Sequence, residues 1–188
     1  MATRTPVGTL ITYGPTLFEA KRMRIDPSKE PRFSGDLIFN AAAQNTQAFK
    51  DLKAAISNAA TTLFGEKMKD PTFKARLKLP LKPYAEGSPG DLKLHAWSNS
   101  APGIVDGDLQ PITVKGDVWA GQLARFTVNP KAFDKSGSVG VNCYLENVQI
   151  TDANRPRLDG RQRAEQAFDR IPTEASSSPA GDDDSDLF

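Results

Sequence analysis

The 188-residue sequence contains one cysteine, Cys143, and one histidine, His95. A single cysteine excludes an internal disulfide and any zinc site of the CxxC type. HxH and HExxH motifs and the spacing of an EF-hand loop are also missing, so we expect Asp106, Asp108 and Asp117 to be loop and turn residues. The sequence therefore predicts neither a metal nor another cofactor.

Long apolar runs are absent as well. No window approaches the roughly 18 apolar residues of a membrane-spanning helix. The residues after Met1, ATRTPVGTL, lack the apolar core of a secretion signal. We therefore expect an intracellular protein without a membrane partner.

The formal net charge is only +1, but it is the sum of two unlike parts. Residues 1–170 contain all 24 Lys and Arg and carry a net charge of +6, whereas residues 171–188 contain five acids and no base. The stretch TEASSSPAGDDDSD within the second part is typical of disorder. The sequence predicts one domain over 1–170, long enough to bury a single core, and a disordered acidic tail over 171–188.

Alternating apolar residues predict strands at residues 8–14, 17–25 and 33–40. The next stretch, 41–64, is rich in alanine and ends at Gly65, which is a typical residue just beyond a helix. Its apolar residues stand at helical spacing: Phe49, Leu52, Ile56 and Leu63. We therefore predict one amphipathic helix after the first strands.

Two segments after this helix alternate apolar residues with basic or aromatic ones. In FKARLKLP, which begins at Phe73, the alternate positions are all basic. In LKLHAW, residues 92–97, they are a lysine, a histidine and a tryptophan. Because successive side chains of a strand point to opposite faces, both segments predict a strand with one apolar and one polar face. We expect the two to pair as a hairpin whose long loop contains Tyr84.

Two later segments show the same period of two. Residues 120–128 turn Arg125 outward, and residues 139–150 turn Tyr144 outward while burying Cys143 as an inert thiol. The apolar phase of the last segment changes before Val148, which predicts a β-bulge near residues 146 and 147. Several short strands with one helix favour a mainly β fold, namely an OB-like antiparallel β-barrel with one amphipathic helix and a disordered acidic C-terminal tail.

Cations beside exposed rings are the groups that single-stranded nucleic acid requires, since its phosphates attract cations and its unstacked bases stack on aromatic faces. His95 has no Cys, Ser or metal-ligand partner at a recognisable spacing, so we expect no catalytic residue and no enzymatic activity. The residues predicted to bind nucleic acid are Lys74, Arg76, Lys78, Tyr84, Lys93, His95, Trp97, Arg125 and Tyr144.

A series of segments resembles the phage-encoded single-stranded DNA-binding proteins. In order, they are FSGDLIFN, ARLKLPL, APGIVDGDLQPI, DVWAGQLARFTVNPKAFD, GVNCYLENVQI and RLDGR. The resemblance as a whole covers about residues 8–168. The resemblance implies an OB-type barrel that coats single-stranded DNA during phage replication and recombination, in the cytoplasm of the infected bacterial host. It also implies an acidic tail that ends in an aromatic residue, as this chain does.

The tail is predicted to reduce DNA binding when no DNA is present and to recruit replication and recombination proteins. The residues predicted to do so are Asp182, Asp183, Asp184, Asp186, Leu187 and Phe188. Two alternatives stay open at this point: a strand-annealing protein or recombination mediator, and a phage structural protein that does not bind DNA. The sequence also leaves open whether the protein forms homo-oligomers.

Overall fold

A computed structural model of the chain describes residues 1–12, 15–21, 30–152, 154–162 and 167. The strands are β1 (Thr3–Arg4), β2 (Gly8–Leu10), β3 (Phe33–Phe39), β4 (Leu81–Pro83), β5 (Leu92–Ser98), β6 (Gly103–Val105), β7 (Leu123–Lys135) and β8 (Ser138–Asp152). The helices are α1 (Pro15–Phe18), α2 (Ala41–Gln44), α3 (Gln47–Phe64) and α4 (Pro71–Arg76), with 3-10 turns η1 (Gly65–Lys69) and η2 (Lys115–Asp117). The predicted mainly β fold is confirmed.

Five of the strands pair in a ring. β2 pairs with β3, β3 with β5, β5 with β8, β8 with β7, and β7 pairs again with β2. Every pair in the ring is antiparallel except β5 with β8, which is parallel. The short strands β1, β4 and β6 add to β7, β5 and β8 respectively. This is the OB-like arrangement, and the predicted antiparallel barrel is corrected at β5–β8 and β6–β8, which are parallel.

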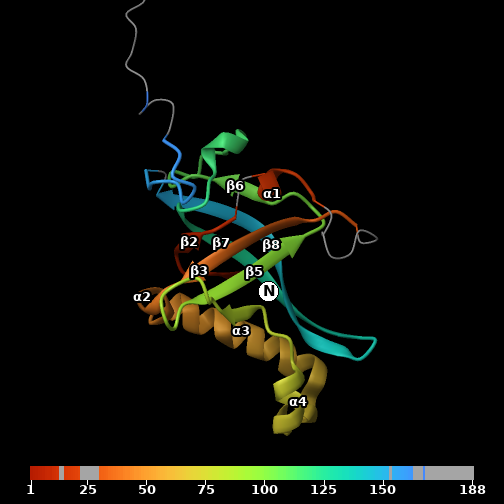
Figure 1. Cartoon of the computed structure of the whole chain (residues 1–188). Helices are drawn as coiled ribbons and strands as arrows, with labels where there is room; N and C mark the ends of the chain where they lie inside the picture. The colour runs from red at the N-terminus through yellow and green to blue at the C-terminus, as the bar shows by residue number, and fades with distance from the viewer. Residues whose placement is uncertain (13–14, 22–29, 153, 163–166, 168–188) are drawn as a thin grey trace, which may run out of the picture.

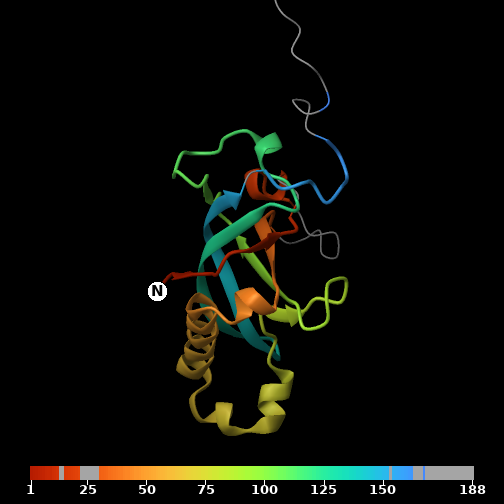
Figure 2. The ribbon, with the colours of Figure 1, turned by 90° about the vertical axis from the view of Figure 1, so that its left-hand side faces the viewer.

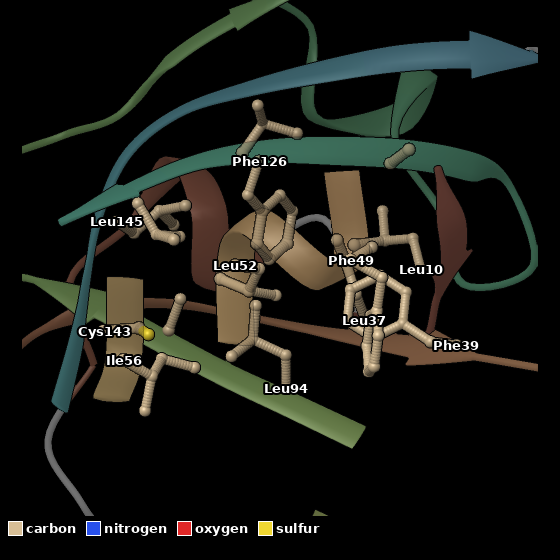
Figure 3. Close-up of a cluster of buried hydrophobic side chains, with 14 of the residues drawn as sticks. Leu10, Leu37, Phe39, Phe49, Leu52, Ile56, Leu94, Phe126, Cys143 and Leu145 are labelled. Atoms are coloured by element: carbon tan, nitrogen blue, oxygen red, sulfur yellow. The ribbon is translucent and has the colours of Figure 1, made fainter. Parts of the chain in front are cut away.

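The core lies between the strand ring and helix α3, which covers one end of the ring (Figures 1 and 2). Figure 3 shows side chains from the strands, including Leu37 and Phe126, facing Phe49 and Leu52 of the helix. The ring of Phe49 packs edge-on against Phe39 with 5.5 Å between centroids. Each such side chain contributes about 1.5–3 kcal/mol when fully buried, so α3 is an integral part of the core.

The helical segment after β3 is divided in two. Asn40 caps α2 by accepting a hydrogen bond from the backbone N–H of Ala43, and Thr46 caps α3 by accepting one from Phe49. Thr46 has an extended backbone, so the single helix predicted from the alanine-rich sequence is interrupted there. Helix α3 ends at Gly65 as expected, but it buries Phe64, whereas Leu63 is 51% exposed.

The strand predicted at 73–79 is wrong, because residues 71–76 form helix α4. Asp70 caps this helix by accepting a hydrogen bond from the N–H of Thr72, and Pro71 occupies its first turn. Phe73 packs against Phe64 with 5.1 Å between ring centroids. Over so few residues an apolar spacing of four fits a helix as well as a strand, and the capping residues decide between them. The hairpin partner of β5 is instead β4, which places the turn after Pro83.

The strand predicted at 17–25 is wrong where the structure describes it, because Leu17 and Phe18 belong to α1. Pro15 begins this helix, in agreement with the preference of proline for a first turn. The strand predicted at 33–40 is confirmed as β3, with Gly35, Leu37 and Phe39 buried on one face.

The bulge predicted in the last strand is confirmed. Thr127 of β7 pairs with Asn147, but the next residue, Val128, pairs with Leu145, so Glu146 has no partner in the register. The inserted residue moves Val148 to the buried face. Cys143 is fully buried, and this burial raises the pKa of its thiol to about 12.

Among the described residues no helix is both long and apolar enough to cross a membrane. Helix α4 lies at one end of the molecule, and the described residues near Gln162 lie at the opposite end (Figures 1 and 2). The predicted acidic tail, 171–188, lies outside the described residues.

Candidate nucleic-acid interface

The central feature of the site is a pair of aromatic rings on the outer face of the strand ring. Trp97 of β5 and Tyr144 of β8 are register partners in the parallel pairing of these strands. Their ring centroids lie 4.6 Å apart with 55° between the ring planes. Both side chains are half-buried, which agrees with the prediction that they point outward from the core.

Each ring has a cation close to it. The guanidinium carbon of Arg32 lies 3.7 Å from the centroid of the Trp97 ring, and the Lys131 ammonium lies 5.4 Å from that of Tyr144. Both distances are within the range of a cation–π interaction. The contacts place a positive charge over each ring of the pair.

A hollow of about 360 Å³ adjoins Trp97. Lys93 and His95 line it from the outer face of β5, Lys82 lines it from β4, and Lys78 lines it from the preceding segment. Lys82 and Lys93 are register partners, so two ammonium groups face the same space. We call this hollow, together with the rings of Trp97 and Tyr144 and the cations of Arg32 and Lys131, the aromatic groove.

The backbone holds Lys78 in place by a bridge to β8. Its N–H donates to the carbonyl of Val139 at 3.0 Å, and its carbonyl accepts from the N–H of Val141 at 2.9 Å. The bridge crosses Gly140, where a β-carbon would lie 2.5 Å from the Lys78 carbonyl oxygen. Glycine is therefore required at position 140 for the Lys78 segment to lie against β8.

One carboxylate lies among the residues that line the hollow. Asp36 of β3 is the register partner of His95, and its carboxylate oxygen lies 2.6 Å from the Nδ1 of that histidine. The contact orients the imidazole. Among the described residues no group of three or more His, Cys, Asp or Glu is placed to hold a metal ion.

Five of the predicted site residues come together in the aromatic groove: Lys78, Lys93, His95, Trp97 and Tyr144. Tyr84 lies next to it, because the Lys93 ammonium is 5.9 Å from its ring centroid. Partial burial and the hydrogen bond from the Tyr84 hydroxyl to Glu86 raise the pKa of Tyr84 above its ordinary value. Tyr84 therefore keeps its proton in neutral solution.

The other three predicted residues lie elsewhere. Lys74 and Arg76 are in the last turn of α4, so they do not share an outer strand face with Lys78. Arg125 donates from its Nε to the side-chain oxygen of Gln149 at 2.7 Å, and the amide of Gln149 donates in turn to the carbonyl of Asp106. Arg125 thus fixes the loop after β6 rather than lining the aromatic groove.

Sequence reasoning missed Arg32, Lys82 and Lys131. Lys82 was placed in the loop because the hairpin strand was assigned too early. Lys131 continues the outward register of Arg125, but the predicted strand ended at Val128, before Pro130. Beyond Val128 strand β7 has a partner on one side only, where a proline is tolerated. Extending the alternation through that proline would have found Lys131.

The arrangement is suited to binding a ligand that combines flat rings with negative charge. The half-buried rings offer their exposed parts to unpaired bases, and the surrounding ammonium and guanidinium groups offer charge to phosphates. Neither interaction depends on base identity, because every base has a π-face and every nucleotide has a phosphate.

Comparison with known proteins gives a consistent result. A family model described as "Enterobacter phage Enc34, ssDNA-binding protein" matches residues 10–180. No curated protein sequence matches the chain.

Solved structures show the same fold. The single-stranded DNA-binding protein of bacteriophage Enc34 in complex with ssDNA has a TM-score of 0.61 at 12% identity, over 79% of this chain and 85% of that one. Another structure of the Enc34 protein has a TM-score of 0.60 at 13% identity, over 88% and 89%. The single-stranded DNA-binding protein gp2.5 of bacteriophage T7 has a TM-score of 0.54 at 11% identity, over 81% and 86%.

Proposed function

We infer the function from the family: the chain belongs to the single-stranded DNA-binding protein family of Enterobacter phage Enc34. We propose that it coats single-stranded DNA through the aromatic groove without strong sequence preference. The observation that carries the assignment of the surface is the contact of Trp97 with Tyr144, flanked by Arg32 and Lys131. This proposal assigns the protein to DNA replication and recombination of a phage, in the cytoplasm of the host.

Binding by this surface proceeds through two complementary interactions. Bases stack on the exposed parts of Trp97 and Tyr144, and phosphates lie against Lys78, Lys82 and Lys93. Each phosphate that a cation neutralises releases a counterion, so the affinity depends strongly on salt. In duplex DNA the bases already stack on one another, so the rings gain nothing there and single strands are preferred.

The function requires no reaction, and the residues of the groove are assigned to binding. Asp36 and His95 form a contact that orients the imidazole, with no Ser, Thr or Cys among the residues that line the hollow with them. Incubation of labelled DNA with the protein and Mg²⁺ should therefore return the DNA intact, and cleavage would contradict this part of the proposal.

We assign the acidic C-terminal residues a regulatory role in the same function. Asp182, Asp183, Asp184 and Asp186 carry the charge that would compete with phosphates for the lysines of the groove. Leu187 and Phe188 supply the apolar side chains that a partner protein of replication or recombination would bind.

The test is a comparison of single-stranded and duplex DNA of the same sequence by fluorescence anisotropy. We expect the single strand to bind more tightly, and DNA binding to quench the emission of Trp97. The second tryptophan, Trp119, is only 2% exposed and provides an internal reference. Equal affinity for both forms, with no quenching, would rule out the aromatic groove as the binding surface.

A further inference from the structure

A second pocket lies between α3, α4 and β4, at the edge of the core that α3 shares with the strands. Its volume is about 340 Å³. Ile56 and Ala60 line it from the helix, and Leu77, Leu79 and Leu81 line it from the segment after α4. Leu79 is 44% exposed, so the pocket presents an open apolar surface. Its volume lies at the small end of ligand pockets, which suits one or two apolar side chains.

The rim of this apolar pocket is positively charged. Lys53 of α3 and Lys74 of α4 line it, and neither forms an ion pair with a described residue. The segment that forms its outer wall, residues 66–82, contains six bases and two acids. An occupant that combines apolar side chains with several negative charges would match both the floor and the rim.

The C-terminal end of the same chain has this composition. Residues 182–186 contain four aspartates, and Leu187 and Phe188 follow with the terminal carboxylate. We propose that the apolar pocket binds Leu187 and Phe188 of its own chain, with the preceding aspartates beside Lys53 and Lys74. The proposal rests on the pocket and on the composition of the chain end, and it does not depend on DNA binding.

The length of the chain permits this contact. Phe188 follows Gln162 by 26 residues, which span up to roughly 85 Å when extended. A compact body of this size has a radius of gyration near 15 Å and is therefore roughly 40 Å across. The chain end can consequently pass from the end of the molecule near Gln162 to the opposite end, where α4 lies (Figures 1 and 2).

Leu79 connects the apolar pocket to the aromatic groove. It lines the apolar pocket and also the hollow of the aromatic groove, between Lys78 and Pro80. The two sites therefore share one wall. A chain end held in the apolar pocket lies next to the groove, so its aspartates can still compete with phosphates for the lysines there.

The direct test replaces Phe188 of the full-length chain with the photo-crosslinking amino acid benzoylphenylalanine. After irradiation, mass spectrometry should find intramolecular crosslinks to residues 53–60 or 68–81. Crosslinks to the segments of Trp97 and Tyr144, or products that are mainly dimers, would overturn the proposal.

A blocking variant tests the same contact by affinity. Ser57 is exposed on α3 and lines the pocket, so Ser57→Trp fills the pocket without removing a core side chain. A fluorescent peptide GDDDSDLF should bind the protein shortened to residues 1–170 at least about tenfold more weakly when Ser57→Trp is present. Ala54→Trp, exposed on the same helix but outside the pocket, is the matched control and should bind as the parent does.

Two further peptides separate the apolar from the charged contribution. The peptide with Ala in place of its final Phe should lose most of its affinity at every salt concentration. The peptide with Asn in place of all four Asp should bind more weakly at low salt only, because exposed charges are screened at high salt. Equal binding of all peptides to the parent and to Ser57→Trp would overturn the docking proposal and leave the DNA-binding proposal unaffected.

Discussion

Trp97 and Tyr144 meet across the parallel pair in the strand ring, with their ring centroids 4.6 Å apart. Their contact depends on β5 and β8 running side by side, so neither strand alone creates the site. Because both residues face away from Cys143 and Ala96, which are fully buried beside them, the rings can be changed without opening the core.

Replacing either ring with alanine should weaken binding to single-stranded DNA. Stacking of a base on an aromatic ring contributes about 1–3 kcal/mol, so Trp97→Ala or Tyr144→Ala should lower affinity roughly 5- to 150-fold. The thermal midpoint should change little, because both side chains are half-buried. Anisotropy titrations and thermal melts of the same samples check the two expectations.

Trp119→Phe is the matched control for these variants. Trp119 is 2% exposed, and its indole N–H donates to the carbonyl of Arg155 at 3.1 Å. Its replacement should lower stability and leave the DNA affinity of the folded protein unchanged. A Trp97 variant that behaved in the same way would assign Trp97 to the core instead.

The alternating segments that form β3, β5, β7 and β8 were predicted well. β3, β5 and the buried faces of β7 and β8 follow from period two alone, including the bulge at Glu146. For that reason Lys93, His95, Trp97 and Tyr144 were predicted with the correct orientation.

Alternation misled the prediction at residues 73–79, because an apolar spacing of four also fits a helix. Lys74 and Arg76 were assigned to a strand although Asp70 and Pro71 just before them are helix-start residues. The parallel pairing of β5 with β8 is a long-range contact that no local pattern contains. Arg32 is a further case, since its position over Trp97 depends on the antiparallel pairing of β3 with β5.

Salt dependence should distinguish the cations of the groove from those of α4. If Arg32, Lys78, Lys82, Lys93 and Lys131 each neutralise one phosphate, the slope of log K against log salt is about −3.5, at about −0.7 for each contact on single strands. Affinity should then fall about a hundredfold between roughly 0.05 and 0.2 M salt. Titrations at four salt concentrations measure the slope.

Two double variants make this expectation specific. Replacing Lys82 and Lys93 with Gln removes two contacts and should reduce the magnitude of the slope by about 1.4. Replacing Lys74 and Arg76 with Gln removes the same charge from α4 and should leave the slope nearly unchanged. If the slope fell for the Lys74 and Arg76 variant and not for the Lys82 and Lys93 variant, DNA would bind along α4 instead of in the groove.

Gly140→Ala should damage both stability and the groove. The added β-carbon would lie 2.5 Å from the Lys78 carbonyl oxygen and 2.8 Å from the ring of Phe133. Overpacking of this kind costs about 1–3 kcal/mol, and displacement of the Lys78 segment should weaken DNA binding as well. Gly116→Ala, where a β-carbon meets nothing within 4 Å, should change the free energy of unfolding by less than about 0.5 kcal/mol. Urea denaturation compares the two variants.

Cys143 should make the stability of the protein depend on pH in the alkaline range. Burial raises the pKa of its thiol to about 12 in the folded protein, whereas an unfolded thiol has a pKa of about 8.5. Between these values the unfolded state loses the proton and the folded state keeps it, so the free energy of unfolding falls as pH rises, by up to about 1.4 kcal/mol per pH unit. Below about pH 8.5 the contribution is constant.

The measurement for Cys143 is a set of urea denaturation curves from pH 7 upward, for the parent and for Cys143→Ala. The variant should lack the part of the alkaline decline that the thiol causes. A thiol reagent should also react with the parent only after unfolding. Rapid labelling of the native protein near pH 8 would show that the thiol is accessible and would contradict the burial.

Removal of the acidic C-terminal residues should strengthen DNA binding at low salt. Deleting residues 171–188 changes the formal charge from +1 to +6. Competition between the aspartates and phosphates is an interaction of exposed charges, so it should be strongest at low ionic strength and weak near 1 M, where the Debye length is about 3 Å. Replacing Asp182, Asp183, Asp184 and Asp186 with Asn in the full-length chain should reproduce most of the gain, because it removes the charge and keeps the length.

If the deletion strengthened binding and the Asn variant did not, the effect would come from the bulk of the segment and not from its charge. Equal affinity of all three proteins at low salt would reject competition altogether.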